Sequence, residues 1–212
     1  MTKMHSNLVL VRHGQSLWNE KGLWTGWKDI GLNENGKQEA LKAAESISDI
    51  DFDIAFSSDL LRAFQTLELI KKKLKLHHIP TVIESGLNER HYGIYTGKNK
   101  WQIKKSIGED KFNRLRRSWD EPIPEGESLK DVHKRAVPVY IKNILPLLQK
   151  GQNVLVVAHG NSNRALIKHI EGISDEQISE VELVTGEVVV YHMDKKGEVL
   201  KKEKRESKAK TK

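Results

Sequence analysis

The chain has 212 residues, of which 37% are hydrophobic and 31% are charged, and it has no cysteine. This composition fits one soluble globular domain, and it excludes disulfides and thiolate metal sites. No apolar run approaches 18 residues and segment 1–7 is polar, so we expect neither a membrane-spanning helix nor a secretory signal peptide. We therefore expect a cytoplasmic protein without membrane partners.

The formal net charge of +7 is unevenly distributed. Residues 195–212 contain nine Lys or Arg and three Glu, whereas residues 1–194 contain 27 basic and 26 acidic residues. A nucleic-acid-binding fold carries its basic excess on the folded body, so we expect no nucleic-acid partner. We predict one domain over 1–194 and a basic, mobile tail over 195–212; a polyanion-binding arm is the alternative for the tail.

The first predicted strand ends in a candidate site. Residues 8–16 have the sequence Leu-Val-Leu-Val-Arg-His-Gly-Gln-Ser, in which four apolar residues precede Arg12 and His13, and Gly14 permits a tight turn. Open α/β sheets place ligands at the carboxyl ends of their strands, and the helix that follows can turn free N–H groups towards an anion. This stretch therefore predicts an anion site.

The next elements are a Trp-rich loop over 17–32, a helix over 33–48, a strand over 52–56 and a helix ending near residue 74. The loop either buries aromatic area beside the core or lines the mouth of the site. Arg62 lies in the first turn of the second helix, where a cation opposes the helix dipole. This placement favours anion binding, with an ordinary surface arginine as the alternative.

A strand over 81–83 precedes a dense polar loop over 87–93, which includes Glu89. In a surface loop these residues would be unremarkable, but beside the predicted site they provide a carboxylate and another cation. Helices follow over 99–107 and 109–119. Lys100 begins the first of them, and the arginines that end the second also suit an ordinary helix C-terminus.

The rest of the chain continues the alternation of helices and strands. A long helix over 129–149 should be kinked by Pro138, and a short helix over 174–181 precedes a last strand over 188–192. The alternation predicts an α/β fold, a three-layer α/β/α sandwich.

A second strand repeats the first motif. Residues 154–162 have the sequence Val-Leu-Val-Val-Ala-His-Gly-Asn-Ser, so His159 follows an apolar run in the same way as His13. A lone histidine after a strand is more often structural. The matched pair, with Arg12 beside the first, favours two imidazoles converging on one site.

These residue types point to phosphate chemistry. His13, Glu89 and His159 match no local metal-binding spacing, and the nearby cations would repel a metal. Arginine binds phosphate oxygens bidentately, and a neutral imidazole can attack phosphorus and carry the phosphoryl group. Glu89 could protonate the leaving oxygen and deprotonate the incoming hydroxyl. Its pKa would have to rise for the acid role.

Arg12-His13-Gly14 resembles the signature of the histidine phosphatase superfamily. Within it, the chain is similar to the 2,3-bisphosphoglycerate-dependent phosphoglycerate mutases over residues 11–19, 25–27, 87–93, 97–100, 116–117 and 158–166. The resemblance implies a phosphoglycerate mutase-like fold with a mostly parallel central sheet. It also implies interconversion of 3-phosphoglycerate and 2-phosphoglycerate in glycolysis and gluconeogenesis, through a phosphohistidine primed by 2,3-bisphosphoglycerate, without a metal.

By resemblance, His13 is the phosphohistidine and Glu89 is the proton donor and acceptor. Arg12, Arg62 and His159 hold the phosphoryl group that is transferred. The resemblance assigns substrate binding to Arg12, Ser16, Asn19, Thr25, Gly26, Arg62, Glu89, Arg90, Tyr92, Lys100, Arg116, Arg117, Gly160 and Asn161.

Three positions depart from the family pattern: Gln15 replaces the usual Glu, Asn163 replaces the usual Leu, and segment 118–126 is short. The short segment bears on closure of the site and on assembly, for which we expect a monomer or a small homo-oligomer. The alternatives are a histidine phosphatase that hydrolyses small phosphate esters and a non-catalytic phosphate-ligand-binding protein. Lys100 and the two arginines at 116–117 favour the mutase.

Overall fold

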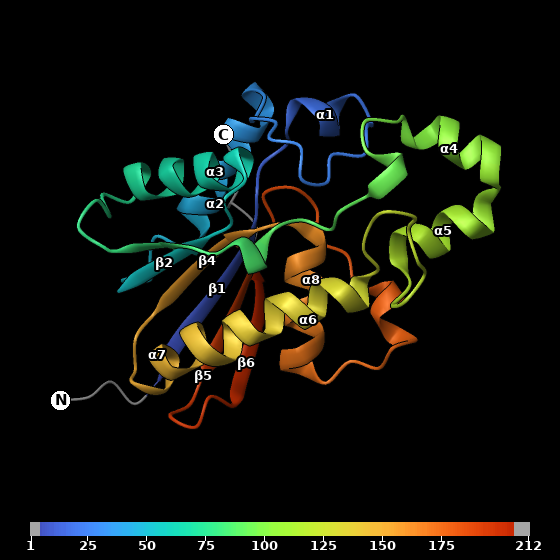
Figure 1. Cartoon of the computed structure of the whole chain (residues 1–212). Helices are drawn as coiled ribbons and strands as arrows, with labels where there is room; N and C mark the ends of the chain where they lie inside the picture. Colours follow the sequence, from blue (N-terminus) through green and yellow to red (C-terminus); the bar gives the residue numbers. More distant parts are fainter. Residues whose placement is uncertain (1–4, 206–212) are drawn as a thin grey trace.

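The computed structural model describes residues 5–205, which form a six-stranded sheet in the order β3-β2-β4-β1-β5-β6 (Figure 1). The strands are β1 (Ser6–Arg12), β2 (Ile54–Ser57), β3 (Thr81–Ile83), β4 (Val154–Ala158), β5 (Val188–Met193) and β6 (Val199–Arg205). The first four are mutually parallel, whereas β5 and β6 are antiparallel to their neighbours. The predicted α/β sandwich with a mostly parallel sheet is confirmed.

Helices cover both faces of the sheet. They are α1 (Leu17–Glu20), α2 (Glu34–Ser46), α3 (Leu61–Lys73), α4 (Lys100–Ile107), α5 (Glu109–Arg117), α6 (Leu129–Val139), α7 (Leu145–Gln149) and α8 (Gly160–Glu171). Short 3₁₀ turns occur at η1 (Ser85–Leu87), η2 (Gly93–Tyr95) and η4 (Gln177–Glu180). Helices α2 and α3 pack together, as do α6 and α8. No helix within residues 5–205 is both long and apolar enough to cross a bilayer.

Strand β1 is buried on both faces because helices cover both. Leu8 and Leu10 belong to the core beneath α6 and α8, whereas Val9 and Val11 belong to the core beneath α2 and α3. All four side chains are fully buried. This double burial explains why the strand is a continuous apolar run rather than an alternating one.

The predicted single helix over 129–149 is wrong in its middle. Helix α6 ends at Val139, a π-helical turn, η3 (Tyr140–Ile144), follows, and α7 begins at Leu145. The Leu145 N–H donates to the Tyr140 carbonyl, five residues back. Proline at 138 and again at 146 removes backbone donors, and the π-helical turn lies between these two positions.

The predicted boundary at residue 194 is also wrong. Strand β6 lies within the expected tail and pairs with β5 from Val188↔Arg205 to Met193↔Val199. Arg205 forms an ion pair with Asp49 from the α2–β2 connection. The sheet therefore extends to residue 205, and the remainder of the expected tail, 206–212, lies outside the described residues.

Candidate active site

The sheet brings His13 and His159 together. Strands β1 and β4 are parallel neighbours in which Arg12 is paired with Ala158, so the residue after each strand emerges at the same edge. The two buried imidazole rings lie edge to face with their centroids 4.9 Å apart. At the turn after His13, a Cβ on Gly14 would lie 2.1 Å from the Gly36 carbonyl oxygen, so only glycine fits.

Hydrogen bonds define the state of the His13 ring. Its Nδ1 lies 2.6 Å from the Gly14 carbonyl oxygen, which can only accept, so Nδ1 carries the proton. Its Nε2 accepts from Arg62 Nε at 3.3 Å. Burial, together with the charges of Arg62 and Arg12, holds the His13 pKa well below its usual value. The imidazole is therefore neutral at neutral pH, with its lone pair on Nε2.

The second histidine is neutral for the same reason. Burial, followed by the charge of Arg62, lowers the pKa of His159 well below its usual value. Its Nε2 lies 2.7 Å from Ser58 Oγ. Its buried Nδ1 has no hydrogen-bond partner among residues 5–205.

Two arginines surround the His13 ring. Arg62 is 1% exposed, and its terminal nitrogens donate to the carbonyls of Gly26 at 2.8 Å and Lys28 at 3.0 Å. Burial lowers the Arg62 pKa to about 10, so it remains charged at neutral pH. Arg12 donates through Nη1 to the Leu183 carbonyl at 2.5 Å, and its buried Nε is without a partner in the described part of the chain.

Glu89 is a buried carboxylate on the loop after η1. Its Oε1 accepts from the Arg90 backbone N–H at 2.7 Å and from Asn161 Nδ2 at 2.8 Å. Burial raises the pKa of this carboxyl, but these hydrogen bonds and the charges of Arg12 and Arg62 outweigh burial and place the pKa below its usual value. Glu89 is thus ionised in the free site.

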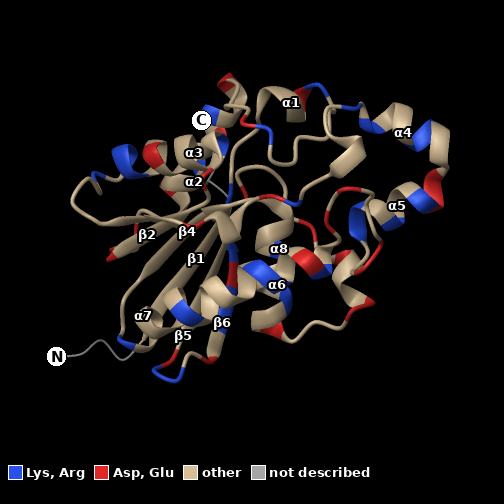
Figure 2. Cartoon of the chain, in the orientation of Figure 1, with Lys and Arg blue, Asp and Glu red and all other residues tan. Residues whose placement is uncertain are grey.

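Two adjoining cavities have four lining residues in common, namely Arg12, Glu89, Tyr92 and Lys100. The inner cavity, of about 300 Å³, is lined by Arg12, His13, Asn19, Thr25, Gly26, Arg62, Glu89, Tyr92 and Lys100. The outer cavity, of about 500 Å³, is lined by Arg12, Trp24, Glu89, Tyr92, Lys100, Arg116, Arg117, Gly160, Asn161, Arg164, Glu182 and Leu183. Both linings are rich in cations, and Figure 2 shows the basic positions that α4 and α5 contribute. The pair suits an extended ligand with two anionic groups.

The outer cations repel one another. Burial, followed by the charges of Arg116 and Arg12, lowers the Lys100 pKa to about 8. Burial and the neighbouring charge of Arg117 also lower the pKa of Arg116. An anionic ligand would relieve this repulsion, so binding such a ligand is favoured electrostatically.

Two of the residues that the resemblance assigns to substrate binding do not line either cavity, and neither does His159, whose ring packs against that of His13. Ser16 is fully buried and forms a reciprocal capping box with Asn19 at the start of α1. Arg90 is 1% exposed, donates to the Leu115 carbonyl at 2.7 Å and lies against the Tyr92 ring at 5.0 Å. Both support residues that do line the site.

Sequence reasoning missed three residues that line the outer cavity, namely Arg164, Glu182 and Leu183. Trp24 also lines it, and it belongs to the Trp-rich loop for which lining the mouth of the site was one of two alternatives. Arg164 donates to Asn161 Oδ1 at 3.0 Å and to the Arg117 carbonyl at 2.6 Å, so it links Asn161 to the end of α5. The signal available in the sequence was a charged residue directly before the apolar residues 165–167. Glu182 pairs with Arg117 at 2.6 Å. Within residues 5–205, no three His, Asp or Glu side chains are arranged to hold a metal.

Comparisons with known proteins agree with this geometry. Residues 8–205 match the family model of the histidine phosphatase superfamily (branch 1). The chain is 44% identical to the 2,3-bisphosphoglycerate-dependent phosphoglycerate mutase of Parvibaculum lavamentivorans, over 94% of this chain and 96% of that protein. It is 48% identical to the protein of the same name from Rhodopseudomonas palustris, over 88% and 91%. The solved structure of mycobacterial hydrolase 1 superposes with a TM-score of 0.78 at 23% identity, covering 89% of this chain and 92% of that one, and shares the fold.

Proposed function

The chain belongs to the histidine phosphatase superfamily (branch 1), and we propose that it is an enzyme that interconverts 3-phosphoglycerate and 2-phosphoglycerate. The observation that carries this proposal is the neutral His13 in the inner of two cationic cavities, with Glu89 lining both. Relatives at 44% and 48% identity with nearly full coverage are 2,3-bisphosphoglycerate-dependent phosphoglycerate mutases, which supports the same reaction.

In the first half of the reaction, His13 Nε2 attacks phosphorus, a P–N bond forms, and the bond from phosphorus to the leaving oxygen breaks. Glu89, which takes up a proton once a bound phosphate raises its pKa, gives that proton to the leaving oxygen. Arg12, Arg62 and His159 hold the phosphoryl oxygens, on which charge accumulates in the transition state. Their buried atoms without partners, Arg12 Nε and His159 Nδ1, suit this task.

In the second half, Glu89 removes the proton from a phosphoglycerate hydroxyl, which attacks phosphorus and breaks the P–N bond. His13 regains its lone pair and Glu89 is again protonated, so protons balance over the cycle. Lys100, Arg116 and Arg117 hold the carboxylate and the second phosphate in the outer cavity. The lysine ammonium and the two planar guanidinium groups can bind the substrate in two orientations, which a mutase requires.

The two cavities also fit a bisphosphorylated primer, because each is lined by at least three Lys or Arg side chains. When bound, 2,3-bisphosphoglycerate supplies the phosphoryl group for His13. Binding residues on this chain are those of the two linings, with Thr25 Oγ1 buried and unpartnered among the described residues. Absence of cysteine and the small glycolytic substrates support a cytoplasmic location.

A phosphatase is the second candidate, because the same His13, Glu89 and His159 would hydrolyse a phosphate ester if water replaced the hydroxyl. Product analysis by ³¹P NMR tests the assignment. With 3-phosphoglycerate and a trace of 2,3-bisphosphoglycerate, we expect 2-phosphoglycerate to accumulate, and the His13→Ala variant to form none. Inorganic phosphate as the sole product would instead establish the phosphatase. Absence of a phosphate adduct by intact mass would leave a non-catalytic binding protein.

A further inference from the structure

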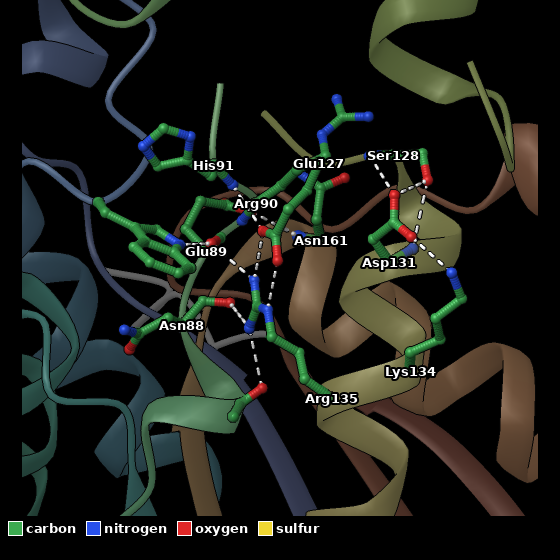
Figure 3. A network of polar contacts seen from close by, with 12 residues as sticks. Asn88, Glu89, Arg90, His91, Glu127, Ser128, Asp131, Lys134, Arg135 and Asn161 are labelled. Atoms are coloured by element: carbon green, nitrogen blue, oxygen red, sulfur yellow. Dashed lines mark hydrogen bonds and ion pairs between the residues drawn. The ribbon is translucent and has the colours of Figure 1, made fainter. Parts of the chain in front are cut away.

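One arginine outside both cavities holds the backbone around Glu89. Arg135 lies on α6, and its guanidinium donates through Nη1 to the carbonyls of Gly86 at 2.9 Å and Asn88 at 2.8 Å (Figure 3). Its Nη2 donates to the Glu89 carbonyl at 2.9 Å. A single side chain therefore binds three carbonyls of the segment that carries the carboxylate.

Glu127 completes the arrangement from the start of the same helix. It accepts Arg135 Nε on Oε1 and Arg135 Nη2 on Oε2, both at 2.8 Å. Its Oε2 also accepts the His91 backbone N–H at 2.8 Å. All five guanidinium N–H donors of Arg135 are thus used. Together, Arg135 and Glu127 bind the chain on both sides of Glu89, and we name this pair the clamp.

The Glu89 segment needs such partners because residues 88–92 form neither helix nor strand. Their backbone groups have no regular ladder, and buried carbonyls left without donors are costly. The Glu89 carbonyl receives Arg135 Nη2 and also Trp27 Nε1, the latter at 2.6 Å. The Arg135 guanidinium lies 5.7 Å from the centre of the Trp27 ring, so the two donors are packed against each other.

The ends of the clamp are fixed independently of the site. Ser128 and Asp131 form a reciprocal capping box that begins α6 directly after Glu127. The side chains of Arg135 and Glu127 are only 20% and 17% exposed. By contrast, Lys134 on the same helix is 66% exposed and pairs with Asp131 at 2.8 Å, as Figure 3 shows. Lys134 therefore provides a matched control.

We infer that Arg135, held by Glu127, is a positioning residue for proton transfer by Glu89, an inference that rests on the proposed function. Arg135 lines neither catalytic cavity, so it acts through the backbone of Glu89. Proton transfer requires heavy atoms about 2.6–3.2 Å apart, and a misplacement of about 1 Å can cost about 100-fold in rate. Lysine at position 135 would keep the charge but lose the planar five-donor fork.

Comparing two leaving groups tests this role. The variants are Arg135→Lys and Glu127→Gln, with Lys134→Ala as the control, and each is checked by thermal unfolding. For 3-phosphoglycerate conversion, we expect kcat to fall by about 10- to 100-fold in both clamp variants while KM stays within about threefold. Single-turnover phosphorylation of His13 by p-nitrophenyl phosphate should change by less than about threefold, because p-nitrophenolate leaves without a proton from Glu89.

Other outcomes overturn the inference. An unchanged kcat in Arg135→Lys refutes a positioning role, and an equal loss with both phosphate donors shows a general structural defect instead. A loss in Lys134→Ala as large as in the clamp variants assigns the effect to α6 as a whole. If the unsubstituted chain forms no 2-phosphoglycerate, the proposed function fails, and the clamp is then tested by the same leaving-group comparison on ester hydrolysis.

Discussion

Asn161→Ala removes one of the hydrogen bonds that keep Glu89 ionised. In the free site, Asn161 Nδ2 donates to Glu89 Oε1 at 2.8 Å, and the backbone N–H of Asn161 donates to the same oxygen at 3.3 Å. Of the two donors to Glu89, alanine removes only the first; it also removes the contacts of the Asn161 side chain with Tyr92 and Arg164. A hydrogen bond to a buried charged group stabilises it by about 1.5–3 kcal/mol, and one pKa unit corresponds to about 1.4 kcal/mol. The Glu89 pKa should therefore rise in the variant.

The sign of the effect follows from the direction of the shift. A carboxyl whose pKa is lowered by folding contributes stability above its unfolded pKa, and this stability is lost as pH falls through the folded pKa. The variant should lose part of it at neutral pH. Because Glu89 must be ionised to accept a hydroxyl proton, the acid limb of kcat/KM should also move to higher pH.

Titration of ¹³C-labelled glutamate carboxyls by NMR measures the Glu89 pKa directly, with Glu89→Gln to assign its signal. Asn143→Ala is the matched control, because it removes an exposed 2.6 Å hydrogen bond from an asparagine to Glu84 and should leave Glu89 unchanged. A Glu89 pKa in Asn161→Ala that equals or falls below that of the unsubstituted chain would refute the reasoning.

Three further predictions concern the outer cavity and the sheet. Lys100 has a pKa of about 8 and is charged below that pH, so kcat/KM for 3-phosphoglycerate should fall above about pH 8. Lys100→Arg should remove this fall because arginine stays charged. If the fall persists in the variant, another group causes it. Arg116→Ala should raise KM by about 10-fold or more while His13 phosphorylation at saturating donor changes little, and equal losses would place Arg116 at the phosphoryl group. Truncation after Asp194 removes β6 and exposes the β5 edge, so the thermal midpoint should fall and aggregation should increase; an unchanged midpoint would show that β6 contributes no stability.

The histidine pair was predictable because strand ends obey a simple rule. An apolar run followed by His-Gly at residues 13 and 159 needs only a parallel sheet to bring both imidazoles to one edge. The helices with clear apolar periodicity, such as α2 and α3, were predictable for a similar reason. These features depend on local pattern plus one topological rule.

Strand β6 was hidden because it is an edge strand. Its sequence, Val-Leu-Lys-Lys-Glu-Lys-Arg, is mostly exposed, and edge strands often carry charge that discourages pairing with other chains. Composition alone therefore suggests a solvated tail. The roles of Arg135 and Arg164 were hidden for another reason: each binds backbone carbonyls that lack regular partners, and such carbonyls are known only once the loops are placed.

The protonation state of Glu89 links substrate binding to the direction of proton transfer. Arg12 and Arg62 help to keep Glu89 ionised in the free site. In the proposed reaction these arginines bind phosphate oxygens, which offsets their charge and adds negative charge nearby, so we expect the Glu89 pKa to rise towards the range required of an acid. Departure of the phosphoglycerate reverses the change and restores a base, which can activate either a new hydroxyl or water. On the proposed function, we therefore expect the ratio of mutase to hydrolase activity to depend on how long the outer cavity, through Lys100 and Arg116, retains the phosphoglycerate beside phosphorylated His13.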